Sequence, residues 1–196
     1  MKSLDLRIIV ELRKRGELSI NSLAKNLGET YDTVRRHTHL LVKDGLLKTR
    51  SEGRKILASL AEGVAARSAV ALAESIRFED AMARADRELA ELASALVRSL
   101  GEKFPDTKID LFFYGSFVDE RKHKADLDVF VVTPPEKKEI VKKSLPPDER
   151  LHALVVSEEE FSVMEIKQEP TVVQAMLAGI HLQLPFPTHR RPIFAT

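Results

Sequence analysis

Apolar residues recur every three or four positions in the first part of the chain, a spacing that predicts three short amphipathic helices. The first helix covers residues 3–15 and ends at a glycine. Ser19 is placed to cap the second helix, which stops at Gly28, and Thr30 to cap the third, which ends near Gly45. The pattern therefore predicts that the second and third helices are joined by a tight glycine-containing turn and follow the first helix.

A β-hairpin is predicted directly after these helices. Residues 46–50 and 54–58 flank a turn at Ser51-Glu52-Gly53. Three helices and such a hairpin resemble the winged helix-turn-helix domain of bacterial and archaeal regulators. Residues 41–47, Leu-Val-Lys-Asp-Gly-Leu-Leu, resemble the exit of the recognition helix in that family. The resemblance implies that the third helix lies in the major groove of DNA and that the hairpin touches the adjacent backbone.

The residues implied in DNA contact are polar side chains of the third helix and the hairpin. They are Tyr31, Thr33, Arg35, Arg36 and His39, with His37 also expected to be exposed, and Arg50, Arg54 and Lys55 on the hairpin. His37 and His39 do not share a helix face, so we do not interpret them as metal ligands. A solvated helix on a fold that serves as a protein-interaction module is the open alternative.

Helical sequence connects the two halves of the chain. Residues 61–76 are alanine-rich and apolar on several sides, which is typical of a helix buried between elements or in a homodimer. A packing helix inside a monomer is the alternative. A longer helix with an apolar stripe is predicted from Phe78 to Phe104, where Pro105 stops it. We therefore expect the domain boundary between about residues 60 and 80, within helical sequence.

Two apolar runs in the second half, 109–114 and 129–132, read as buried strands, and polar residues gather between them. Gly115-Ser116 follows the first strand, and Asp126 and Asp128 begin the second. Carboxylates two apart on a strand face the same side and suit a divalent cation. A Gly-Ser turn can offer a backbone N–H and a hydroxyl to a phosphate. Together these residues predict Mg²⁺-assisted phosphoryl or nucleotidyl transfer.

The same residues resemble the minimal nucleotidyltransferase domains of the DNA polymerase β-like superfamily. Residues 151–161 resemble the third strand and following helix of that family, and 179–182, Gly-Ile-His-Leu, its closing segment. The resemblance implies that Asp126 and Asp128 hold Mg²⁺ (or Mn²⁺). It also implies that the Gly-Ser turn binds the phosphates of a nucleoside triphosphate.

Three features depart from that family. His152 stands where a third acid is usual, and it is predicted to serve as a catalytic base. Val118-Asp119-Glu120 replaces an Ala-Arg-Gly that follows the Gly-Ser turn in many members, and nine residues, in place of ten, separate Ser116 from Asp126. The connecting loop nevertheless offers three cations, which we predict to bind the triphosphate: Arg121, Lys122 and Lys124.

Charged residues are unevenly distributed along the chain. Its formal net charge is +1, but residues 1–60 carry 13 basic and 7 acidic residues, a net of +6, which leaves −5 for residues 61–196. A basic first part beside an acidic remainder confines the expected nucleic-acid contact to the first part. The chain has no cysteine, which excludes disulfides and thiolate zinc sites. No apolar run reaches membrane-spanning length and no signal-peptide pattern begins the chain, so we expect a cytoplasmic protein without membrane contact.

We therefore expect an α+β chain with three parts: a winged helix-turn-helix domain (1–60), a helical connector (61–80) and a nucleotidyltransferase-like α/β domain with a small mixed sheet (81–196). The leading functional hypothesis is a DNA-binding enzyme that transfers a nucleoside monophosphate to an acceptor hydroxyl. One alternative is a transcriptional regulator whose degenerate transferase-like domain binds nucleotide without catalysis. Another is an antitoxin-type partner of a helical protein.

Overall fold

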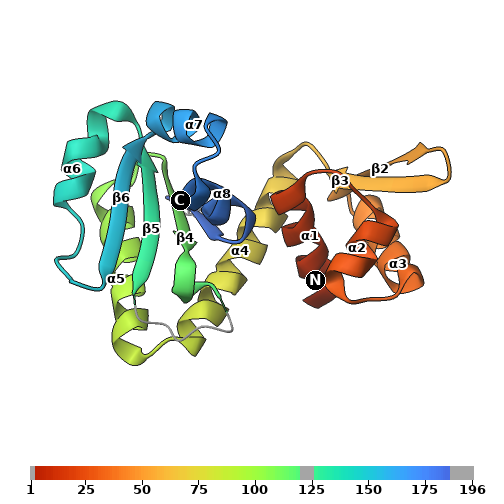
Figure 1. The fold of residues 1–196 in the computed structure, drawn as a ribbon, viewed down its shortest axis with the longest axis horizontal. Coiled ribbons are helices and arrows are strands. Elements are labelled where there is room, and N and C mark those ends of the chain that lie inside the picture. Colours follow the sequence, from red (N-terminus) through yellow and green to blue (C-terminus); the bar gives the residue numbers. More distant parts are fainter. Residues whose placement is uncertain (1–2, 120–125, 186–196) are drawn as a thin grey trace, which may run out of the picture. The chain divides into compact units, whose positions relative to one another are not determined.

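The computed structural model describes residues 3–119 and 126–185. The chain divides into two compact units, Met1–Arg77 and Phe78–Thr196, and each is described by itself. Helices and small sheets occur in both units, so the α+β prediction is confirmed (Figure 1). Within the described residues, no helix combines the length and apolar character needed to cross a membrane.

The first unit begins with three helices and a hairpin. Its elements are α1 (Ser3–Arg15), β1 (Leu18–Ser19), α2 (Ile20–Leu27), α3 (Tyr31–Lys43), β2 (Leu47–Glu52) and β3 (Lys55–Leu60). The strands form an antiparallel sheet in the order β1-β3-β2. This is a winged helix-turn-helix fold, as the sequence predicted. Its apolar core includes Ile8, Ile9 and Leu12 of α1 and Val34 and Leu41 of α3.

The predicted caps define the ends of α2 and α3. The hydroxyl of Ser19 accepts a hydrogen bond from the Ser22 backbone N–H, and that of Thr30 accepts one from Thr33. These contacts satisfy backbone donors that the first turn of a helix leaves without intrahelical partners. Gly28 then takes a left-handed conformation (φ 66°) and ends α2.

The prediction of one helix from Phe78 to Phe104 is wrong, because this stretch belongs to two helices. They are α4 (Val64–Arg84) and α5 (Arg87–Lys103). Between them Asp86 has an extended backbone (ψ 162°) and its carboxylate accepts a hydrogen bond of 2.8 Å from the Leu89 N–H. An N-cap carboxylate starts a new helix there, and the apolar stripe of α5 continues so regularly that the sequence pattern hides the break. The split between the units falls inside α4.

The second unit contains a four-stranded mixed sheet in the order β6-β5-β4-β7. The strands are β4 (Ile109–Tyr114), β5 (Leu127–Thr133), β6 (Leu151–Ser157) and β7 (Ile180–Leu184). β5 and β6 are parallel, and the other pairs are antiparallel. Its other elements are η1 (Gly115–Phe117), η2 (Pro135–Lys137), α6 (Lys138–Lys143), α7 (Glu158–Ile166) and α8 (Pro170–Leu177). The small mixed sheet agrees with the prediction.

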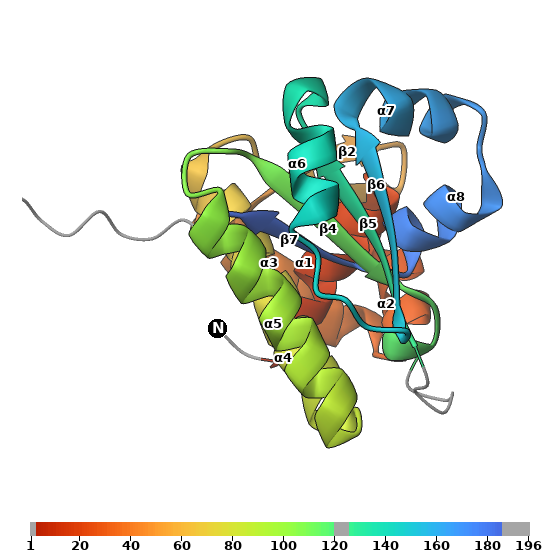
Figure 2. The same cartoon turned by 90° about the vertical axis from the view of Figure 1, so that its left-hand side faces the viewer.

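The two faces of this sheet carry different side chains. One face packs with α5 and α6 in a large apolar core that includes Leu96, Leu111, Val129 and Val141. The opposite face is covered in part by α7 and α8 through a smaller cluster of Phe112, Phe130, Phe161, Val172 and Ala175 (Figures 1 and 2). Because side chains alternate along a strand, polar residues two positions from Phe112 and Phe130 lie on this same second face.

Candidate nucleotide site and nucleic-acid interface

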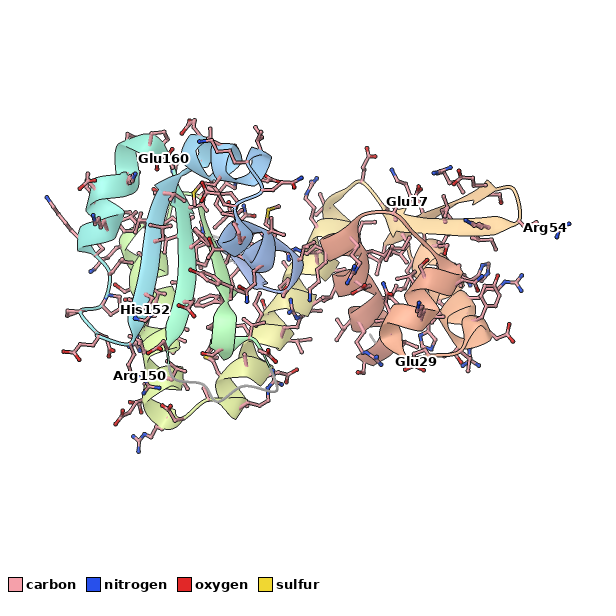
Figure 3. All side chains as sticks on the ribbon, in the orientation of Figure 1. Glu17, Glu29, Arg54, Arg150, His152 and Glu160 are labelled. Carbon is pink, nitrogen blue, oxygen red and sulfur yellow. The ribbon has the colours of Figure 1, made fainter. Side chains whose placement is uncertain are left out.

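Three polar side chains form a row across the second sheet. Tyr114 of β4 is the register partner of Asp128 of β5, which in turn is the register partner of His152 of β6. Register partners point to the same face, so the row brings a phenol, a carboxylate and an imidazole together. The His152 Nδ1 lies 3.4 Å from the Asp128 Oδ1. Figure 3 shows His152 near the end of β6 that is farther from Glu160.

The Gly-Ser turn lies against this row. Gly115 begins η1 with φ of 67°, and an ideal Cβ built on it would come within 2.2 Å of the Asp128 Oδ2. Both the left-handed backbone and the close carboxylate require glycine here. The Ser116 hydroxyl donates a 3.4 Å hydrogen bond to the backbone carbonyl of Asp126. The fold therefore joins the two motifs that the sequence separates.

Asp126 differs from the expectation that both aspartates lie on one strand. β5 begins at Leu127, so Asp128 is within the strand and Asp126 immediately precedes it. The Leu127 N–H donates a 2.8 Å hydrogen bond to the Arg150 carbonyl. The Asp128 side chain is 27% exposed and that of His152 55%, so the row is open to solvent. A ligand can reach both groups without a change in the sheet.

Tyr114 ends the strand before the Gly-Ser turn, and the sequence analysis gave its side chain no role in the site. Burial raises the pKa of its phenol, and the negative charge of Asp128 raises this pKa further. Its ring stacks on Phe130 with centroids 5.2 Å apart. A neutral phenol beside the carboxylate follows at neutral pH. Its place beside Asp128 follows from the pairing of β4 with β5, which the sequence alone does not give.

The donors present suit a hard divalent cation that is shared with a ligand. Among the described residues, no group of three or more His, Asp or Glu side chains is arranged to hold a metal ion. Mg²⁺ commonly uses one or two carboxylates and completes its shell with water and substrate phosphates. Asp126 and Asp128 fit that requirement by chemistry. Three predicted phosphate-binding residues, Arg121, Lys122 and Lys124, lie outside the described residues.

A second polar network lies on the same sheet face. The His181 Nε2 is 2.8 Å from the Asp110 Oδ1, and the Lys108 Nζ is 3.0 Å from the Asp110 Oδ2. The His181 ring stacks on Phe112 with centroids 4.3 Å apart. Burial raises the pKa of Asp110, but hydrogen bonds from His181 and Lys108 outweigh burial and hold this pKa below its ordinary value. We interpret this network as structural, because Asp110 is nearly buried and both of its partners are side chains of the same unit.

In the first unit, α3 presents one exposed polar side. Tyr31, Arg35, Arg36 and His39 are exposed on it. Thr33 is half-buried, and its hydroxyl accepts a 2.9 Å hydrogen bond from the hydroxyl of Thr30.

The expectation that His37 is exposed is wrong. This side chain is 7% exposed and its Nδ1 lies 2.7 Å from the Asp5 Oδ1. Position 37 lies three residues after Val34 and four before Leu41, which places it on the face of α3 that packs on the core.

The hairpin carries the remaining predicted contact residues. Arg54 lies at its tip, as Figure 3 shows, and Lys55 begins β3. Tyr31, Arg54 and Lys55 line one small cavity of about 160 Å³, so the helix start and the hairpin tip are brought together. Arg50 is exposed, and its Nε donates a 2.9 Å hydrogen bond to Glu17.

Comparisons with known proteins are limited to parts of solved structures. No protein-family model and no curated protein sequence matches the chain. Reduced HlyU from Vibrio cholerae is 25% identical over 39% of this chain and 75% of its own, with a TM-score of 0.33. ZitR from Lactococcus lactis is 18% identical over 53% and 75%, with a TM-score of 0.35. BpsR from Bordetella bronchiseptica is 23% identical over 36% and 54%, with a TM-score of 0.33. Because these scores are low, the fold assignment rests on the topology of the chain itself.

Proposed function

We propose that the chain is a DNA-binding regulator whose second unit binds a nucleotide. The exposed polar side of α3 carries the proposal: Arg35, Arg36 and His39 lie on a recognition helix beside a hairpin that adds Arg54 and Lys55. This winged-helix part holds the positive charge of the chain, a net of +6 in residues 1–60 against −5 in the rest, which favours a polyanion.

Anisotropy titration of a labelled mixed-sequence DNA duplex with the full chain tests DNA binding. We expect affinity to fall steeply with salt, because lysine and arginine contacts release counterions from phosphates. The Arg35→Gln/Arg36→Gln double variant should weaken binding about tenfold or more. Arg98→Gln, which changes an exposed arginine of α5, is the matched control and should leave affinity within about twofold. Equal losses in both variants would show that the contact is not through α3.

Nucleotide binding by the second unit is supported by the turn at Gly115 and the carboxylate of Asp128. The turn leaves its backbone close to that carboxylate, with no Cβ between them. A triphosphate with its Mg²⁺ can then contact backbone N–H groups and the carboxylate at once. Calorimetric titration with each nucleoside triphosphate and Mg²⁺ is the test. We expect Asp128→Asn to weaken binding about tenfold, whereas Asp106→Asn, an exposed aspartate before β4, should not.

Nucleotidyl transfer is the second candidate function, and the Asp128–His152 contact favours it. An imidazole held by a carboxylate can accept the proton of an acceptor hydroxyl. A Mg²⁺ ion held by Asp126 and Asp128 would neutralise charge on the nucleotide phosphates. Incubation with α-labelled triphosphates and Mg²⁺ or Mn²⁺ tests this function. Label transfer that is lost in His152→Ala supports it. Nucleotide binding without any label transfer would reject the enzyme and keep only the regulator proposal.

A further inference from the structure

A cavity opens between α3 and the hairpin of the first unit. Its volume is about 540 Å³, which falls in the range of pockets that bind small molecules. Residues from α2, α3, β2 and β3 line it. Every one of these elements belongs to the same compact unit, so the cavity is a property of the winged-helix fold itself.

Thr38 gives the first indication of a ligand. Its side chain lines the cavity and is 2% exposed, yet among the described residues its Oγ1 has no hydrogen-bond partner. A buried hydroxyl without a partner costs about 1–3 kcal/mol. Most buried polar groups are satisfied, so this hydroxyl is an unusual group to leave at a cavity wall. A polar atom of a bound molecule would satisfy it.

The remaining lining residues define the chemistry of that molecule. Ile20, Val42 and Ile56 supply apolar surface from three separate elements. The charged lining groups are Arg35 and Arg36 against one carboxylate, Asp32, so the net charge is positive. A molecule that satisfies both features has an apolar body and an acidic group.

We propose that this cavity binds a small amphipathic organic anion. The apolar body contacts the isoleucines and valine, the acidic group faces Arg35 and Arg36, and a polar atom pairs with the Thr38 hydroxyl. DNA is a poorer occupant, because a phosphodiester backbone pairs with arginine but brings no apolar body to bury. One consequence rests on the proposed function: the ligand and DNA use the same arginines, so the ligand competes with DNA.

The anionic dye 1-anilinonaphthalene-8-sulfonate is a suitable probe, since it combines an aromatic body with a sulfonate. We expect the full chain to bind it saturably with one site per chain. Thr49→Trp should weaken binding about tenfold or more, because an indole from exposed position 49 fills the cavity. Lys48→Trp is the matched control: the neighbouring residue faces the other side of β2, and binding should stay within about twofold.

Thr38→Val tests the buried hydroxyl separately. Valine keeps the shape but removes the Oγ1, so dye binding should fall about fivefold, the loss of one hydrogen bond. The free energy of unfolding should stay unchanged or rise, because an unpartnered buried polar group is gone. A purely structural role for this hydroxyl would instead lower stability and leave dye affinity unchanged.

Dye binding elsewhere would overturn the proposal. Ile166 on α7 is 81% exposed and is the obvious competing apolar site, so Ile166→Asp should leave dye affinity unchanged. Loss of binding in Ile166→Asp, or no response to Thr49→Trp, rejects the cavity as the site. Competition with a labelled duplex separates the two proposals. Cavity-dependent dye binding without any duplex binding rejects the proposed function alone, and duplex binding without cavity-dependent dye binding rejects the ligand proposal alone.

Discussion

The carboxylate of Asp128 occupies the space that a side chain at Gly115 would need, since an ideal Cβ there would lie 2.2 Å from the Asp128 Oδ2. The backbone of Gly115 is also left-handed, with φ of 67°. The turn and the carboxylate are therefore in such close contact that position 115 has room for a hydrogen atom and for no side chain. Any change at position 115 acts on both the conformation of the turn and the position of Asp128.

Gly115→Ala should lower the free energy of unfolding by about 1–3 kcal/mol, through left-handed strain and the clash with Asp128. Urea unfolding monitored by circular dichroism measures this loss. Gly101→Ala is the matched control, because Gly101 lies in α5 with no atom within 4 Å of an added Cβ. It should stabilise the protein by about 0.5–1 kcal/mol, since alanine is the better helix former. Adding Asp128→Ala to Gly115→Ala should recover the part of the loss that the clash causes; no recovery would place the whole effect in the backbone.

Lys14 should make stability depend on pH in the alkaline range. Burial, followed by repulsion from Arg77, lowers the pKa of Lys14 to about 8. An unfolded lysine titrates near pKa 10.4, so between about pH 8 and pH 10 the unfolded chain binds more protons and stability rises with pH. Below pH 8 both states are protonated and the buried charge opposes folding.

Lys14→Met should therefore stabilise the protein at pH 7 by about 1–2 kcal/mol, after allowance for partial solvent screening. The variant should also lose the rise in stability between about pH 8 and pH 10. Urea unfolding at pH 7 and pH 9.5 measures both effects, with Lys25→Met on the exposed side of α2 as control. If the free energy of unfolding of Lys14→Met rose with pH as much as that of the wild type, Lys14 would not be the cause of the pH dependence.

Asp110 should contribute to stability at neutral pH and lose that contribution in acid. Although burial raises its pKa, hydrogen bonds from His181 and Lys108 outweigh burial and depress this pKa overall. A depressed carboxyl pKa stabilises the fold above the unfolded value of about 3.9 and loses this effect as pH falls through the folded pKa.

Asp110→Asn should consequently destabilise the protein by about 1–3 kcal/mol at pH 7, and the gap to the wild type should close below about pH 4. Urea midpoints at several pH values measure it. Asp106→Asn, an exposed carboxylate nearby in sequence, should show little effect at any pH. A gap that persists unchanged into acid would assign the loss to packing.

His152→Asp should strengthen binding of Mn²⁺ with a nucleoside triphosphate by about tenfold, because it puts a second oxygen ligand beside Asp128. Calorimetry with Mn²⁺ and nucleotide provides the measurement. Leu154→Asp is matched to it, since Leu154 lies two residues further along β6 on the same face and is 46% exposed. Equal gains in both variants would indicate a general charge effect.

Local rules predicted most elements of the fold. The caps at Ser19 and Thr30 follow from hydrogen-bonding preferences of single residues, so sequence was sufficient. The hairpin was predicted, but its turn was wrongly placed at residues 51–53: Ser51 and Glu52 pair with Ile56 and Lys55, and the turn lies at residues 53–54. The break at Asp86 was missed because the apolar spacing runs through it. His37 was misplaced, because its burial depends on Asp5, 32 residues away.

The site shows the same division between local and long-range causes. The sequence singled out Gly115, Ser116, Asp126 and Asp128 by their order along the chain, and the structure brings them close together. Tyr114 joined them only through strand register, which depends on pairing between β4 and β5. The cavity beside α3 was not predicted at all, because it requires Ile20, Thr38 and Ile56 to converge from separate elements.

The carboxylate of Glu17, just before β1, lies against the hairpin residue Arg50 as its counterion. The hydrogen bond from the guanidinium holds the pKa of Glu17 below its ordinary value. Under the proposed function, a DNA phosphate that binds Arg50 would compete with Glu17 for the guanidinium. Removal of this counterion, as in Glu17→Gln, would then leave Arg50 free for phosphate and raise duplex affinity, a change that anisotropy titration measures.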